Sequence, residues 1–240
     1  MPSPRPLEGK VAVLTGVSRP GQVGESVARS LAESGVAVML IDRTGHDAEA
    51  RANELRADGL KATAYGADLT DTAQLDRVVR AVASEFDGID ALVNIAGGFS
   101  TSGKVAESDP DAWARQMAIG LTTAYITTRA FLPLARKRQG SIVFFASAAA
   151  LPGARIADMS AYAASKAAVI TLMRAIAQEE RDTGVRANAL APTSIRTATN
   201  LEAMGTNARY VERGEVADAV RFLCFSDAAR AISGQVIQLG

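Results

Sequence analysis

Residues 11–35 read VAVLTGVSRPGQVGESVARSLAESG, and this stretch decides the fold class. It opens with a short apolar run, passes through a glycine-containing turn and continues with apolar residues at helical spacing. Gly35 then supplies a signal that ends the helix. The order of strand, glycine turn and helix predicts the first βα unit of a parallel sheet.

The same alternation continues along the rest of the 240-residue chain. Start signals for helices occur at Asp71 and at Asp109-Pro110. Parallel strands need crossover connections, so we expect one Rossmann-like, doubly wound α/β domain, a parallel seven-stranded sheet with helices on both faces. That domain would cover residues 9–240 after an N-terminal tail at 1–8, with residues 193–213 as a substrate loop. The predicted strands lie at 11–14, 36–41, 61–65, 91–94, 142–145, 185–190 and 235–239.

Composition argues against several classes of function. The chain has 26 basic and 26 acidic residues and no block of like charges, which disfavours a nucleic-acid or membrane-surface partner. It contains no apolar run long enough for a membrane span or a secretory signal, so we expect a cytoplasmic protein. Cys224 is the single cysteine, and its apolar neighbours predict a buried thiol. His46 is the single histidine and is expected in a polar loop, so no metal site is predicted.

The turn after the first predicted strand has the features of a dinucleotide site. Ligands of open parallel sheets bind beyond the carboxyl ends of the strands. Gly16, Gly21 and Gly24 lie there, where bare backbone and a helix N-terminus can approach a pyrophosphate. Asp42 closes the second predicted strand, where a carboxylate can accept hydrogen bonds from ribose hydroxyls. The alternative is an ordinary glycine-proline turn with an unrelated aspartate.

A tyrosine and a lysine sit four residues apart near the start of the long helix predicted at 160–181. Positions i and i+4 share one helical face, so Tyr162 and Lys166 can point into the same cleft. A nearby ammonium favours phenolate over phenol, which predicts a lowered pKa for Tyr162, as a general acid/base requires. Taken alone, such a pair is more often two exposed surface residues than part of a catalytic site.

In these motifs the chain resembles the short-chain dehydrogenase/reductase family over nearly its whole length. The matching segments are the glycine loop at 15–24, GADLTD around Asp68, NIAG from Asn94, the strand leading to Ser147, the Tyr162 and Lys166 pair, and VRANALAPTSIRT at 185–197. The resemblance implies an NAD(P)-dependent oxidoreductase that transfers a hydride between a nicotinamide cofactor and a ketone or secondary alcohol.

The resemblance also implies roles for individual residues. Ser147, Tyr162 and Lys166 would be catalytic: Ser147 would hydrogen-bond the reacting oxygen, Tyr162 would act as general acid/base, and Lys166 would hold the nicotinamide ribose. The residues implied to bind the cofactor are Gly16, Ser18, Arg19, Gly21, Val23, Gly24, Asp42, Arg43, Asp68, Leu69, Asn94, Ala96, Gly97, Tyr162, Lys166, Pro192, Ile195 and Thr197.

The chain departs from the family pattern at four places. Gly120 stands where the family has an asparagine that connects the lysine to a water relay. The glycine loop is two residues longer and contains Arg19-Pro20. Thr193 replaces a glycine, and the connection from Ser147 to Tyr162 is about two residues longer than usual. These departures motivate an alternative function, a dinucleotide-binding sensor or structural subunit with little turnover.

Opposing charges bear on the choice of cofactor. A carboxylate at Asp42 would repel a 2'-phosphate and favour NAD. Arg43 and Arg19 could pair with that phosphate and favour NADP. We expect NAD to be preferred, because a carboxylate at a strand end is held beside the ribose whereas both arginines can turn into solvent.

Substrate and assembly are less constrained by the sequence. Phe99, Leu151 and Met159, together with the loop at 193–213, would form a mostly apolar pocket, and sugar, steroid, acyl thioester and cyclic alcohol substrates all remain open. The segments 113–132 and 161–177 are apolar almost all round, so each must be buried on more than one side. We therefore expect a homo-oligomer, and the family resemblance implies a dimer or a tetramer.

Overall fold

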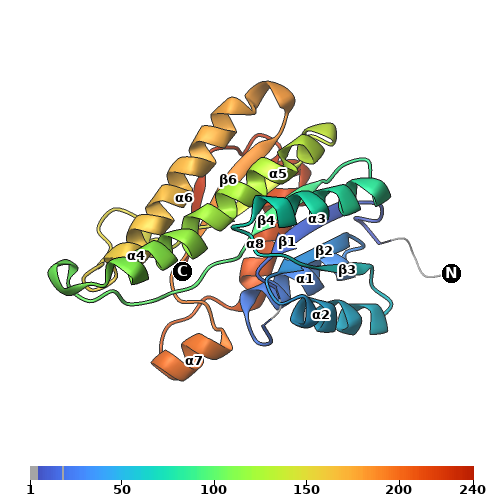
Figure 1. The fold of residues 1–240 in the computed structure, drawn as a ribbon. Coiled ribbons are helices and arrows are strands. Elements are labelled where there is room, and N and C mark those ends of the chain that lie inside the picture. Colours follow the sequence, from blue (N-terminus) through green and yellow to red (C-terminus); the bar gives the residue numbers. More distant parts are fainter. Residues whose placement is uncertain (1–4, 18) are drawn as a thin grey trace.

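The structure is a computed structural model that describes residues 5–17 and 19–240. Ser18, one of the predicted cofactor-binding residues, and residues 1–4 of the predicted tail lie outside the described residues. One sheet of seven parallel strands runs through the molecule in the order β3-β2-β1-β4-β5-β6-β7 (Figure 1). The strands are β1 (Val11–Thr15), β2 (Ala37–Asp42), β3 (Ala62–Gly66), β4 (Ala91–Asn94), β5 (Ser141–Phe145), β6 (Arg186–Pro192) and β7 (Val236–Leu239).

The predicted sheet is therefore confirmed, with strand boundaries that differ from the predicted ones by at most two residues. The strand order reverses beside β1, where Val13 pairs with Met39 of β2 on one side and with Leu92 of β4 on the other. Every residue of β1 is buried, which is typical of a parallel strand covered on both faces. The carboxyl ends of β1 and β4 thus flank the point where a doubly wound fold binds its ligand.

Helices cover both faces of the sheet (Figure 1). The core of one face is completed by α3, α5 and α6, and that of the other by α1, α2 and α8. The helices are α1 (Val23–Glu33), α2 (Gly45–Ala57), α3 (Thr72–Glu85), α4 (Pro110–Met117), α5 (Thr123–Lys137), α6 (Ser160–Glu179), α7 (Ala198–Met204) and α8 (Arg213–Phe225). Shorter turns are η1 (Val105–Glu107), the π-helical η2 (Ala118–Thr122), η3 (Ala148–Ala150), η4 (Arg181–Thr183) and η5 (Asp227–Ala229).

Helix ends follow the signals in the sequence. Asp71 caps α3 by accepting hydrogen bonds from the backbone N–H groups of Ala73 and Gln74. Asp109 caps α4 in the same way, with Pro110 as the first helical residue. Gly35 follows the end of α1 with a φ of +103°, a conformation that favours glycine.

The apolar segment at 113–132 is not one regular helix. It is divided between α4 and α5 by the π-helical turn η2. Gly120 lies in this turn, and a Cβ atom there would be 2.5 Å from Ser165 Oγ and 2.9 Å from Ser165 Cβ of α6. A glycine is therefore what lets this turn approach α6 so closely.

Three further expectations can be compared with the structure. Cys224 is buried, and burial raises the pKa of its thiol to about 12, so the predicted buried thiol is confirmed. His46 is exposed but lies in the first turn of α2, so its predicted loop position is wrong. Within residues 5–17 and 19–240, no helix is both long and apolar enough to cross a membrane, and no group of three potential metal ligands occurs.

Candidate active site

A cavity of about 630 Å³ opens beyond the carboxyl end of the sheet. Its walls come from the loop after β4, the segment from Ser147 to the start of α6, and residues 193–204. The lining includes Phe99, Leu151 and Met159, the three residues predicted to form an apolar pocket with the 193–213 loop. Ser147 and Tyr162 line the same cavity, so the structure brings the predicted reacting groups together.

Ser147 is held by the turn that follows β5. It is nearly fully buried and forms the N-cap of η3, where its Oγ accepts a hydrogen bond of 3.2 Å from the backbone N–H of Ala149. Because that bond occupies one lone pair of the hydroxyl oxygen, it helps to position the oxygen and leaves the hydroxyl proton to be donated to Tyr162 or to a substrate oxygen.

Tyr162 lies in the first turn of α6. Its ring meets the ring of Phe99 edge-on, with 5.1 Å between the centroids and 82° between the planes. Burial raises the pKa of the Tyr162 phenol above its usual value, and a hydrogen bond with Ser147 acts in the opposite direction without cancelling it. The lowered pKa predicted for Tyr162 is therefore wrong: loss of solvation dominates.

Lys166 lies one helical turn further on and is almost completely buried. Its Nζ donates a 2.7 Å hydrogen bond to the backbone carbonyl of Phe145, the last residue of β5. Burial lowers the pKa of Lys166 to about 8. This pKa lies above neutral pH, so Lys166 remains largely protonated there, and the raised pKa of Tyr162 is due to loss of solvation.

The glycine loop between β1 and α1 fits a dinucleotide phosphate group. Gly16 has a φ of +72°, and a Cβ atom on it would be 2.6 Å from the Cα of Ala96. A Cβ on Gly24 would be 2.4 Å from the carbonyl oxygen of Gly16. Gln22, the N-cap of α1, makes no side-chain capping bond, so the first turn of α1 keeps N–H groups for an anion. The loop therefore offers the bare backbone that phosphate binding needs.

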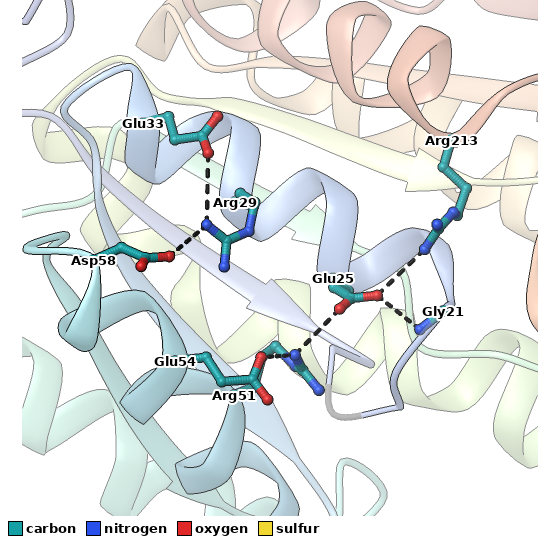
Figure 2. A network of polar contacts seen from close by, with 8 residues as sticks. All are labelled: Gly21, Glu25, Arg29, Glu33, Arg51, Glu54, Asp58 and Arg213. Carbon is teal, nitrogen blue, oxygen red and sulfur yellow. Dashed lines mark hydrogen bonds and ion pairs between the residues drawn. The ribbon is translucent and has the colours of Figure 1, made fainter.

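A partly buried charge network that the sequence analysis did not find supports this loop (Figure 2). Glu25 accepts hydrogen bonds from the N–H of Gly21 at 2.7 Å, from Arg51 at 3.2 Å and from Arg213 at 3.3 Å. Burial alone would raise the pKa of Glu25, but these three partners together lower it. The carboxylate thus ties the glycine loop to α2 and to the start of α8. The spacing of charges along the chain offers no signal for such long-range pairing.

The predicted substrate loop lies directly against the glycine loop. The N–H of Ala198, at the start of α7, donates to the carbonyl of Gly21 at 2.9 Å. Thr197 is buried and caps α7 by accepting a 3.2 Å hydrogen bond from the N–H of Asn200. Ile195 forms an isolated bridge with Val211, which brings the two ends of the loop together.

The remaining predicted cofactor residues differ in their burial and in their hydrogen-bond partners. Asp42 ends β2 and accepts a 2.8 Å hydrogen bond from the N–H of Arg43. Hydrogen bonds from Thr70 lower the pKa of Asp68, with a smaller contribution from Arg43.

Asn94 is buried and donates to Thr128 of α5 at 3.0 Å, so its side chain joins β4 to α5. Arg19 is exposed, Leu69 and Pro192 are buried, and Val23, Ala96 and Gly97 lie at the loops after β1 and β4.

Comparisons with known proteins agree with this geometry. The model of the short chain dehydrogenase family matches residues 10–207. The chain is 31% identical to 2-(S)-hydroxypropyl-CoM dehydrogenase 3 of Xanthobacter autotrophicus over 95% of this chain and 94% of that protein. The crystal structure of gox2181 is 30% identical and superposes with a TM-score of 0.89, covering 97% of this chain and 95% of the other. A 3-oxoacyl-[acyl-carrier protein] reductase with bound NAD from Brucella melitensis is 28% identical, with a TM-score of 0.85 over 98% of this chain and 91% of that one.

These matches agree with three features of the structure: the seven-stranded parallel sheet, a glycine loop that side chains would obstruct, and a serine and a tyrosine in one cavity. The chain belongs to the short-chain dehydrogenase family of NAD(P)-dependent oxidoreductases, whose members interconvert alcohols and carbonyl compounds.

Proposed function

We propose that this protein reduces a ketone, or oxidises the matching secondary alcohol, with Tyr162 as the general acid/base. The observation that carries the proposal is the placement of Ser147 and Tyr162 in one cavity, with Lys166 one turn behind the tyrosine. Ser147 can donate its hydroxyl proton to the substrate oxygen, and Tyr162 can deliver or remove the proton that accompanies hydride transfer.

The protonation state of Tyr162 suits proton donation. Because burial raises its pKa, the phenol keeps its proton at neutral pH and can pass it to a carbonyl oxygen. The nicotinamide, when bound, supplies or accepts the hydride, while the protein supplies position and charge. Lys166 would hold the nicotinamide ribose. Its Nζ lies 3.2 Å from where a Cβ on Gly97 would be, so the loop after β4 reaches the lysine closely.

We further propose that NAD is preferred over NADP. Asp42 ends β2 beside β1, where the ribose of a dinucleotide binds in this fold. Its carboxylate would repel a 2'-phosphate, and Arg43 and Arg19 are the basic residues that oppose this effect.

Replacement of Tyr162 by phenylalanine tests the function directly. Tyr162→Phe keeps the ring that meets Phe99 and removes the proton donor, so we expect a loss of turnover of about a hundredfold or more. NADH affinity, measured by fluorescence titration, should be unchanged. A panel of ketones and alcohols followed by nicotinamide absorbance gives the rates, and undiminished turnover in Tyr162→Phe would remove the tyrosine from the mechanism.

The alternative, a dinucleotide-binding protein with little turnover, draws on Gly120. This residue offers no side chain for a proton relay, and the space where its Cβ would lie is limited by Ser165. Tight NADH binding by the wild-type protein without turnover of any ketone or alcohol would favour this alternative.

We also propose that the protein is a cytoplasmic homo-oligomer, a dimer or a tetramer, that acts on a small molecule. Trp113, Ile119 and Tyr125 lie along α4, η2 and α5 with exposed fractions of 38%, 45% and 50%. A run of large apolar side chains along neighbouring helices is typical of an interface between subunits.

A further inference from the structure

Among the described residues, one basic side chain lines the cavity. Among the described residues that line it, Arg155 is the only arginine or lysine, and none is an aspartate or glutamate. Arg155 is exposed, and no hydrogen bond or ion pair joins its guanidinium to another described residue. The rest of the lining is mostly apolar, with several neutral polar side chains.

The loop that carries Arg155 is held in place by its backbone. The N–H of Ala154 donates to Leu151 at 3.3 Å, and the N–H of Met159 donates to Ile156 at 3.2 Å. The carbonyl of Asp158 accepts a hydrogen bond of 2.7 Å from the N–H of Ser102, which ties this loop to the segment after β4. The backbone of Arg155 is thus positioned, while its side chain is free to meet a ligand.

We propose that the substrate is a carbonyl compound or alcohol with an apolar body and a negatively charged end group, which Arg155 binds. The proposal rests on the proposed function and adds a substrate class to it. A guanidinium presents paired N–H donors that match the two oxygens of a carboxylate, and the same donors fit a sulfonate or a phosphate. Among the described residues of the cavity wall, no carboxylate competes for Arg155 or repels such a ligand.

Matched acids and esters test the proposal. Levulinate, 5-oxohexanoate and 7-oxooctanoate are each compared with their methyl esters, because the esters keep the ketone and lose the charge. Wild type, Arg155→Gln and the control Arg80→Gln are assayed with NADH and NADPH. Arg80 is exposed on α3, away from the cavity, so its replacement matches the change in charge. Binding of the same pairs to Tyr162→Phe and to Tyr162→Phe with Arg155→Gln, each saturated with NADH, is measured by calorimetry.

We expect at least one acid to exceed its ester in kcat/KM by about fivefold or more, and Arg155→Gln but not Arg80→Gln to abolish that preference. Esters that equal or exceed the acids at every length, or a preference that survives Arg155→Gln, would overturn the proposal while leaving the reductase function intact. If no ketone is turned over, the proposed function fails, but calorimetry still tests the anion site. Acids that bind more tightly than their esters only when Arg155 is present support the site. Equal binding of acids and esters, or a difference that survives Arg155→Gln, refutes it.

A second observation concerns the part of the cavity wall that follows β4. Phe99 has an exposed fraction of 60%, yet its ring is held edge-on against Tyr162. On the neighbouring helix α4, Gln116 has an exposed fraction of only 5%. Its Oε1 accepts a hydrogen bond of 2.7 Å from Ser100 Oγ, and its Nε2 donates one of 3.0 Å to the carbonyl of Gly98. One buried carboxamide therefore holds both residues that flank Phe99.

From these bonds we infer that Gln116 is a positioning residue that sets the Phe99 ring and so limits the substituent a ketone can carry next to Tyr162. This inference also rests on the proposed function. It does not depend on Arg155, because Gln116 acts on the loop after β4.

A double-mutant cycle tests the role of Gln116. Gln116→Met keeps the side-chain length and removes both hydrogen bonds, Phe99→Ala removes the ring, and Gln178→Met, exposed on α6, is the control. Rates are measured with acetone and acetophenone, and the backbone order parameters of residues 98–100 are measured by NMR.

Both single replacements should raise the kcat/KM ratio of acetophenone to acetone by about fivefold, and the double variant should not exceed Phe99→Ala, because residues that act through one another are not additive. The order parameters of residues 98–100 should fall in Gln116→Met only, because both bonds of Gln116 hold this segment. A general structural defect would lower both rates together and leave the ratio unchanged. An unchanged ratio, fully additive effects, or unchanged order parameters would each overturn the inference. The order parameters decide even if no ketone is reduced.

Discussion

Asp42 is the residue on which the proposed preference for NAD depends most. Asp42→Asn removes the charge but keeps an oxygen that can accept the hydrogen bond from the N–H of Arg43. Without the carboxylate, Arg43 can pair with a 2'-phosphate, so we expect the kcat/KM ratio of NADPH to NADH to rise by about tenfold. The measurement is initial rates with each cofactor, with Asp47→Asn, on the exposed first turn of α2, as the control. A wild-type preference for NADPH would show that Asp42 does not decide the choice.

Lys166 makes the stability of the fold depend on pH. Its pKa is lowered from 10.5 in the unfolded chain to about 8 in the folded one, so the cost of burying its charge is fully present below pH 8. As pH rises from 8 to 10.5 that cost disappears, and wild type should gain at most about 3 kcal/mol relative to a variant without the amine.

Urea unfolding of wild type and Lys166→Met at pH 7 and pH 10 measures this difference. Tyrosine ionisation is common to both proteins and largely cancels in the comparison. Lys104→Met, in an exposed loop position, should follow wild type at both pH values. Equal pH dependence in wild type and Lys166→Met would contradict a desolvated lysine.

At the scale of residues, the sequence predicted proximity better than electrostatics. The i, i+4 spacing of Tyr162 and Lys166 placed both on one face of a helix, and the structure agrees. The direction of the Tyr162 pKa shift was predicted wrongly, because helical spacing carries no information on solvation. The sequence did not predict Arg155 or Gln116 as part of the site, because an isolated polar residue in a loop or on a short helix has no periodic signal.

Among the elements, the π-helical turn η2 packs so closely against α6 that we expect a substitution there to disturb the active site. A Cβ at Gly120 would meet Ser165, which lies in α6 between Tyr162 and Lys166. We expect Gly120→Ala to destabilise the fold by about 1–3 kcal/mol and to lower turnover, because the added atom pushes on the helix that carries both groups. Thermal unfolding and kcat are the measurements.

Ser165→Gly provides a matched test of that contact. It removes both Ser165 atoms that the new Cβ would meet, so Gly120→Ala should cost less in the Ser165→Gly background than in wild type. Equal costs in the two backgrounds would show that the loss has another origin.

The strands were predictable because a sheet buried on both faces demands short, continuous apolar runs. Caps at Asp71 and Asp109 were predictable because capping depends on neighbours in the sequence. The turn η2 was not, since helical spacing of apolar residues continues from α4 into α5 and the need for the turn arises only from α6 packing beside it.

For the molecule as a whole, the face formed by α4, η2 and α5 is the surface most suited to a second copy of the chain. Tyr125 is half exposed on α5, and Trp113 and Ile119 extend the same run of apolar side chains. Sedimentation velocity of the wild-type protein at micromolar concentration should therefore show a dimer or a tetramer. Tyr125→Asp would bury a charge without a partner in that interface, so it should shift the population towards smaller species. Phe222→Asp places the same charge at a comparably exposed aromatic residue of α8, on the other side of the sheet, and should leave the assembly unchanged. A wild-type monomer, or an equal effect of both variants, would contradict an interface on this face.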